Sequence, residues 1–123
     1  MILLNKLEKY MLSKKGSRLD FPFGPEPAVY KVGDKMFALC GWQRKIPYLN
    51  LKCDPDDADI LRTMFDSVQP AYHMNKRHWN SVYLDGSVPE EIIHQMIDDS
   101  YDLVIKGLSK AERDRLSVLW GRP

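Results

Sequence analysis

Hydrophobic residues recur along the chain with two different spacings. Near the N-terminus, and again between residues 89 and 107, apolar side chains return at the spacing of one helix face. The first stretch ends at Gly16, and the second contains the longest apolar stripe of the sequence. We therefore predict helices over about residues 2–14 and 89–107.

The middle of the chain carries short runs of β-forming residues instead. Residues 29–32 and 36–40 flank Gly33 and Asp34, a pair that favours a tight hairpin turn. Residues 48–53 alternate between apolar and polar side chains, as a half-buried strand does. These three runs predict three strands joined by short turns.

Further segments are marked by turn and capping residues. Asp54 and Pro55 open a helix that we expect to reach about residue 65, because aspartate caps helices and proline fits their first position. A second hairpin is expected from residues 71–74 and 78–84, with its tip near 75–77.

Two capping boxes are expected in the C-terminal part. Ser87 with Glu90 precedes the long helix, and Ser109 with Glu112 precedes a last short helix toward residue 120. Residues 17–28 are expected to form a loop, because four turn-forming residues crowd into its second half. These residues are Pro22, Gly24, Pro25 and Pro27.

The expected order is helix, three strands, helix, two strands, helix and short helix. Consecutive strands with short turns pair antiparallel, and strands and helices in separate blocks indicate an α+β fold with helices packed on one face of the sheet. The chain has 123 residues, 44% hydrophobic and 28% charged, which fits one globular domain over residues 1–123.

Three further features of the sequence indicate the cellular compartment in which we expect the protein. No apolar run reaches the length of a membrane span, and the N-terminus lacks the pattern of a secretory signal. Cys40 and Cys53 form no closely spaced pair, so we expect reduced, partly buried thiols in a cytoplasmic protein without membrane contact.

Charge is nearly balanced over the whole chain but unevenly distributed. The formal net charge is +1, whereas residues 1–52 hold ten cations against four anions and residues 85–105 hold six anions and no cation. A basic face opposite an acidic one is therefore compatible with the sequence.

The sequence gives little support for an enzyme or a metal-binding protein. No glycine-rich phosphate loop or nucleophile elbow is present. His73 and His78 invite a metal, but no third ligand is evident. Cys40 lies in an apolar run, and Cys53 precedes acidic residues that disfavour its thiolate. We expect no enzyme activity, no cofactor and no metal.

Cations gather instead around the predicted turns. Three pairs stand there, namely Lys31 with Lys35, Arg44 with Lys45, and Lys76 with Arg77. The last pair has polar and aromatic neighbours that could bond or stack with bases. The alternative explanation is that cations at strand edges only keep the protein soluble.

Four blocks of the sequence, in this order, resemble the MmcQ/YjbR family of small bacterial proteins. They are KVGDKMFAL (31–39), LKCDP (51–55), HMNKRHWNSV (73–82) and SYDLV (100–104). The resemblance covers roughly residues 5–116. It implies an α+β fold like that of CyaY, with two β wings for which DNA binding has been proposed from shape.

The resemblance also directs attention to particular side chains. In the matching blocks these are Lys31, Lys35, Lys52, Asn75, Lys76, Arg77, His78 and Trp79. Where many members have a second glycine after Gly33, this chain has Asp34, and an anion there opposes a phosphate contact at that turn.

Two functions of different kinds therefore stay open. The leading hypothesis is a non-enzymatic, monomeric DNA-binding protein of weak to moderate affinity. Asn75 and Trp79 would contact base or sugar, and six cations would contact phosphate, namely Lys31, Lys35, Arg44, Lys45, Lys76 and Arg77. The alternative is a module that binds a small ligand or a protein, with a pocket closed by the loop over residues 21–27. Its polar and aromatic cluster would be Tyr72, His73, Asn75, His78 and Trp79.

Overall fold

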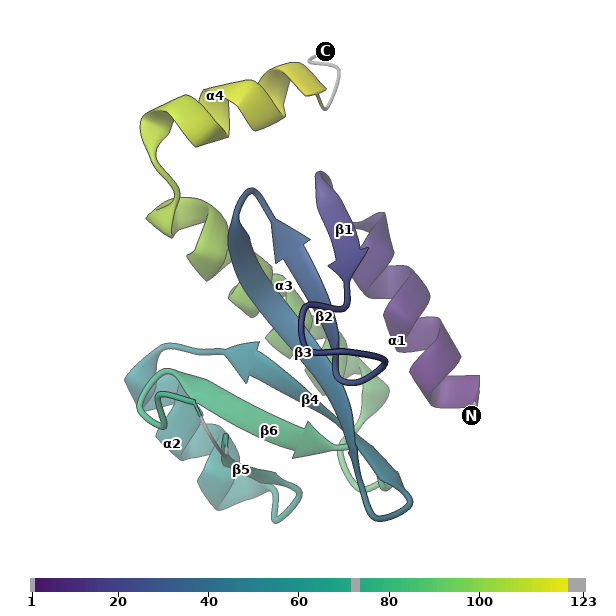
Figure 1. Cartoon of the computed structure of the whole chain (residues 1–123). Coiled ribbons are helices and arrows are strands. Elements are labelled where there is room, and N and C mark those ends of the chain that lie inside the picture. Colours follow the sequence, from purple (N-terminus) through teal and green to yellow (C-terminus); the bar gives the residue numbers. More distant parts are fainter. Residues whose placement is uncertain (1, 72–73, 120–123) are drawn as a thin grey trace.

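A computed structural model describes residues 2–71 and 74–119 and confirms an α+β fold with an antiparallel sheet (Figure 1). Within these residues the strands are β1 (Ser17–Asp20), β2 (Ala28–Val32), β3 (Lys35–Gln43), β4 (Ile46–Lys52), β5 (Val68–Pro70) and β6 (Trp79–Tyr83). The helices are α1 (Ile2–Ser13), α2 (Pro55–Met64), α3 (Glu90–Gly107) and α4 (Lys110–Leu119). The strands lie in the order β1-β2-β3-β4-β6-β5.

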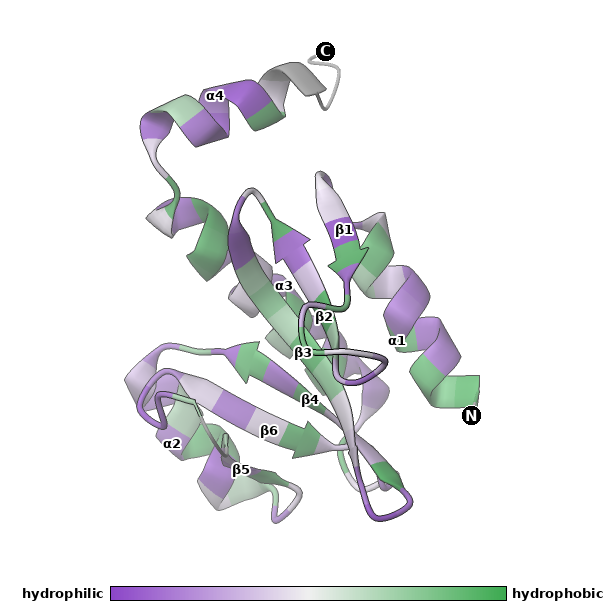
Figure 2. Cartoon of the chain, viewed as in Figure 1, coloured by the Kyte–Doolittle hydropathy of each residue, from purple (hydrophilic) through white to green (hydrophobic). Residues whose placement is uncertain are grey.

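Helices α1 and α3 pack on one face of this sheet and form the core with it. Leu7 and Met11 of α1 and Ile93 and Ile97 of α3 are almost fully buried in one cluster with strand residues such as Tyr30. Burial of such side chains stabilises a fold by about 1.5–3 kcal/mol each. Strands β2 and β3 are largely hydrophobic, whereas α4 is mostly hydrophilic (Figure 2).

The opposite face of the sheet has no helix over it in the described part of the chain (Figure 1). Strand side chains alternate between faces, so Leu49 and Leu51 of β4 point into the core while Lys52 and its alternate neighbours point to the other side. We call this second side the open face. Its cross-strand pairs between β4 and β6 are Tyr48 with Tyr83, Asn50 with Ser81, and Lys52 with Trp79.

A buried serine joins α3 to the sheet at a local irregularity. The pairing of β2 with β3 shifts between Tyr30 and Lys31, which leaves Phe37 without a direct partner on β2. The Ser100 hydroxyl donates to the Phe37 carbonyl at 2.5 Å and accepts from the Lys52 amide at 2.8 Å. It therefore pins both the start of β3 and the end of β4 to the helix.

Three local predictions differ from the structure. Strand β1 lies in the predicted loop and pairs with β2, and its mostly exposed residues give no alternating signal. Besides β4, strand β6 pairs with β5, which lies earlier in the chain than the strand predicted over residues 71–74. Of that predicted strand, residues 72–73 lie outside the described residues. The Ser87 capping box is wrong, because that hydroxyl bonds to Ser67 and Asp85 and Pro89 caps α3 without a side-chain bond.

Other predictions are confirmed. Asp54 caps α2 by accepting from the Asp56 amide at 3.0 Å, and Pro55 is its first residue. At the start of α4, the Ser109 hydroxyl accepts from the Glu112 amide at 3.1 Å, as a capping box requires. None of the helices in the described ranges is long and apolar enough to cross a membrane.

Candidate nucleic-acid interface

One end of the open face brings together several of the predicted binding residues. Lys35 and Met36 begin β3, and Lys52 at the end of β4 pairs with Trp79 at the start of β6. Together they line a hollow of about 310 Å³, which the C-terminal part of α3 completes. Lys35 is exposed, while Lys52 and Trp79 are half-buried. At this end of the sheet, two cations and a half-buried tryptophan thus share one hollow with α3.

The segment before β6 is hydrogen-bonded to the chain directly after Lys52. The Cys53 amide donates to the His78 carbonyl at 2.7 Å, and the His78 amide donates to the Asn75 carbonyl at 3.1 Å. The Asn75 side chain accepts from the Arg77 amide at 3.0 Å, which closes a tight turn. Lys76 and Arg77 extend from this turn as exposed side chains.

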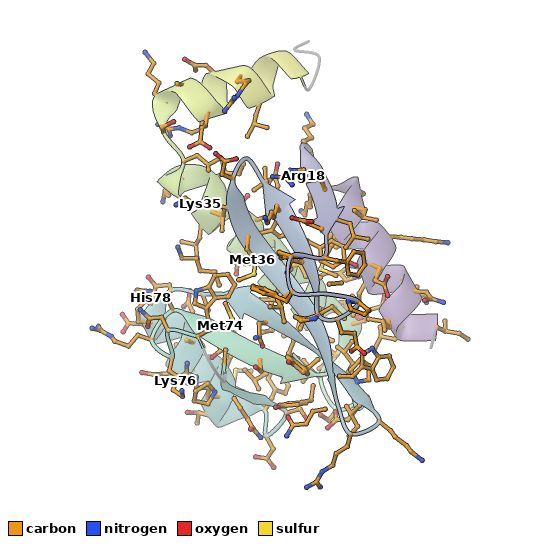
Figure 3. The ribbon with its side chains drawn as sticks, in the orientation of Figure 1. Arg18, Lys35, Met36, Met74, Lys76 and His78 are labelled. Carbon is orange, nitrogen blue, oxygen red and sulfur yellow. The ribbon has the colours of Figure 1, made fainter. Side chains whose placement is uncertain are left out.

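These residues lie along one side of the molecule, which we call the cationic end. Figure 3 shows Lys35, Met36, His78, Met74 and Lys76 in this order from top to bottom on the left side of the view. The resulting group of binding candidates is Lys35, Lys52, Asn75, Lys76, Arg77, His78 and Trp79.

Arg62 of α2 holds the turn in place, a role that the sequence analysis missed. Its guanidinium donates to the Asn80 side chain at 2.7 Å, to the Trp79 carbonyl at 3.4 Å and to the Lys76 carbonyl. A single half-buried cation thus ties a helix to both ends of the segment from Lys76 to Asn80. No local pattern around Arg62 signals this role, because the partners lie 14 to 18 residues further along the chain.

Lys31 lies next to the cationic end but is already paired. It lies on β2 opposite Met36 of β3, and its side chain forms an ion pair with Asp20 at 3.0 Å. The hydrogen bond from Lys31 lowers the pKa of Asp20, so this carboxylate stays charged at neutral pH. A phosphate contact by Lys31 would have to compete with that carboxylate.

The turn between β2 and β3 is covered by the C-terminal segment. A Cβ atom added at Gly33 would lie 3.2 Å from side-chain atoms of Leu108 and Glu112. The Arg18 guanidinium also donates to the Gly33 carbonyl at 3.0 Å. The β2–β3 turn therefore packs against neighbours, and Lys35 is the cation that it presents to solvent.

Arg44 and Lys45 are not brought to the cationic end. They lie in the β3–β4 turn. Arg44 is nine positions after Lys35 along the chain, because Lys35 is the first residue of β3 and Arg44 follows its last one. Nine positions correspond to about 30 Å of extended chain. Arg44 has a φ of 56° and lines a hollow with the carboxylates of Asp66 and Asp85. These anions oppose phosphate binding at this turn.

The alternative ligand cluster is only partly visible. Tyr72 and His73 lie outside the described residues, so the structure brings together Asn75, His78 and Trp79 of that set. No described residue of the loop over 21–27 lines the hollow beside Trp79. A pocket closed over Trp79 by that loop is thus absent from the described residues.

Neither cysteine has the surroundings of a nucleophile. Burial raises the pKa of Cys40 to about 12, and burial together with nearby carboxylates raises that of Cys53 to about 11. Both thiols therefore stay protonated near neutral pH. Within the described ranges, no three His, Cys, Asp or Glu side chains are grouped to hold a metal ion.

Comparison with known proteins places this architecture in a family. A sequence description of the YjbR family matches residues 12–103. The chain is 42% identical over 98 residues to the uncharacterized protein YbdF of Escherichia coli O157:H7, covering 80% of each protein. It is 33% identical over 116 residues to the uncharacterized protein YjbR of Escherichia coli K12, covering 94% of this chain and 98% of that protein.

Solved structures share the fold. The crystal structure of Deinococcus radiodurans DR2400, a protein with a DUF419 domain, has a TM-score of 0.84 at 39% identity over 93% of this chain and 87% of that one. A Pseudomonas syringae protein has a TM-score of 0.71 at 30% identity, over 80% of this chain and 96% of that one. The chain belongs to the YjbR family.

Proposed function

We propose that this protein is a non-enzymatic, monomeric DNA-binding protein and that the cationic end is its contact surface. The observation that supports this most directly is the shared hollow of Lys35, Lys52 and Trp79. These residues come from different strands, and the turn with Lys76 and Arg77 extends the same surface. The double-wing resemblance of the family points to the same class of ligand.

Each part of the cationic end suits a part of a nucleic acid. Lysine and arginine side chains contact phosphates and position the protein without reading sequence. The half-buried Trp79 offers a ring on which an exposed base can stack, an interaction worth about 1–3 kcal/mol. Asn75 and His78 carry hydrogen-bonding groups on the same turn.

The number of cations sets the expected salt dependence. If Lys35, Lys52, Lys76 and Arg77 each neutralise one phosphate, the affinity for duplex DNA falls with a log–log slope of about −3.6. Between about 50 and 200 mM salt this slope corresponds to a loss of about a hundredfold. Since four contacts are few, we expect binding in the micromolar range.

Charge reversal at the turn tests the assignment. We expect Lys76→Glu with Arg77→Glu to weaken binding of a fluorescein-labelled DNA duplex more than tenfold at about 50 mM salt, because two attractions become repulsions. Lys9→Glu with Lys15→Glu is the matched control, since both residues are exposed cations in or just after α1. Equal losses in the two double variants would show that only net charge matters and would refute the site.

A further inference from the structure

A second recess on the open face lies beyond the cationic end, beside the β3–β4 turn. Its volume is about 520 Å³, and three aromatic and three polar residues line most of it. Tyr48 and Tyr83 stand four positions along β4 and β6 from Lys52 and Trp79, which is about 13 Å. The six residues are Trp42, Tyr48, Tyr83, Gln43, Gln69 and Ser81. We call this site the aromatic recess.

The aromatic side chains are arranged as walls. The rings of Tyr48 and Tyr83 are 5.7 Å apart and inclined at 48°. A Cβ at residue 41 would lie 2.6 Å from the Tyr48 hydroxyl oxygen, so Gly41 is what lets this tyrosine lie over β3. Trp42 is 48% exposed, but it alternates with Gln43 along β3, so its side chain points to the other side of the sheet from the tyrosine pair.

The polar side chains leave a donor and an acceptor. The Tyr83 hydroxyl donates to the Gln43 carbonyl oxygen at 2.7 Å, which fixes that amide and leaves its NH₂ group as a donor. The Gln69 NH₂ group donates to the Asp66 carbonyl at 3.2 Å, which leaves the Gln69 amide oxygen as an acceptor. Amide groups of this kind pair with the hydrogen-bonding edges of bases.

The absence of charged side chains among the described lining residues restricts the kind of ligand that the recess can bind. None of the described residues that line the aromatic recess is acidic or basic. A phosphate or carboxylate would find no countercharge within it, so the group that enters is uncharged. A flat ring with neighbouring donors and acceptors satisfies both the aromatic walls and the amides.

We propose that the aromatic recess binds a nucleobase, stacked against the tyrosine pair and held at its edge by Gln43 and Gln69. The base can belong to a free nucleoside or to an unpaired stretch of a nucleic-acid strand. The proposal does not depend on DNA binding at the cationic end, because an uncharged nucleoside needs no phosphate contact.

The test is a titration of the ¹⁵N-labelled full chain with adenosine, guanosine, cytidine and thymidine, followed by NMR. We expect saturable shifts of the Gln43 and Gln69 side-chain amides and of the backbone amides of Tyr48 and Tyr83. Tyr48→Ala should weaken binding about fivefold to a hundredfold, the range expected for one lost base stack. Gln43→Ala should weaken it and change the ranking of the four nucleosides.

Matched variants separate binding from folding. Leu12→Ala and Gln95→Ala remove an exposed apolar side chain and an exposed amide that lie on helices, and both should bind nucleosides like the unaltered protein. Gln43 is exposed and Tyr48 is half-buried, and the amide spectrum of each variant reports whether the sheet is intact.

The same titration with an eight-residue single strand distinguishes the two sources of the base. Binding of the strand that needs both the aromatic recess and Lys76 with Arg77 assigns the base to a strand, while binding of nucleosides without any tighter strand binding assigns it to a free nucleoside. The proposal is overturned if no nucleoside or strand shifts these resonances, if Tyr48→Ala and Gln43→Ala bind unchanged, or if glucose shifts them and nucleosides do not. Loss of salt-dependent DNA binding at the cationic end would leave the nucleoside titration untouched.

Discussion

Replacing Ser100 by alanine is expected to destabilise the fold far more than the loss of one oxygen atom suggests. The side chain is fully buried on α3, and its hydroxyl serves the carbonyl of Phe37 and the amide of Lys52 at once. In the alanine variant both backbone groups lose this partner in a region that water does not reach. Leaving a buried polar group unsatisfied costs about 1–3 kcal/mol, so two such groups give a loss of about 2–6 kcal/mol.

Urea unfolding followed by circular dichroism measures this loss. With a denaturant dependence of about 1–3 kcal/mol per molar urea, the midpoint should fall by 1 M or more, roughly the ratio of the two quantities. Ser13→Ala is the control, because Ser13 is an exposed serine at the end of α1 whose hydroxyl makes a single bond to the Tyr10 carbonyl. If Ser100→Ala and Ser13→Ala shift the midpoint equally, the bridging role of Ser100 is refuted.

Further changes test other contacts. Gly41→Ala should lower the melting temperature by several degrees, because its Cβ would meet the Tyr48 ring, and adding Tyr48→Ala should recover part of the loss. Burial disfavours the Asp98 carboxylate, but hydrogen bonds from Lys14 and Tyr10 outweigh it and lower the pKa of Asp98. Stability from this group is therefore present above the unfolded pKa and is lost as pH falls through the folded one, so Asp98→Asn should flatten the decline of melting temperature below about pH 4. A decline as steep as in the unaltered protein would contradict this. Cys53 should resist iodoacetamide at pH 7 in the folded protein and react after unfolding, which mass spectrometry can follow.

Local patterns predicted the elements whose signals lie within one segment. The apolar stripe of α3 and the Asp54 and Pro55 start of α2 are examples, because in each case the whole signal lies within the helix or directly before it. The start of α3 was predicted less well. Ser87 has a capping sequence, yet its hydroxyl bonds to Ser67 and Asp85, and a contact with a residue 20 positions away cannot be seen from the capping motif.

At the candidate site, too, some features follow from local sequence and others depend on tertiary contacts. The cations on the turns could be identified by inspection, and the family resemblance added Lys52 and Trp79. That these two residues line one hollow with Lys35 depends on the register of β4 with β6, which the sequence does not specify. The anchoring role of Arg62 depends on where α2 meets the segment before β6, again a tertiary contact.

The salt dependence of DNA binding tests the central claim most directly. Fluorescence anisotropy of labelled duplex and single-stranded DNA would be recorded at several salt concentrations between about 50 and 200 mM, for the unaltered chain and for Lys76→Glu with Arg77→Glu. A cationic end with four phosphate contacts predicts saturable duplex binding with a log–log slope of about −3.6, and weaker binding with a shallower slope in the double variant. No saturable binding of either DNA at the lowest salt, or an equal slope and affinity in the two proteins, would contradict it.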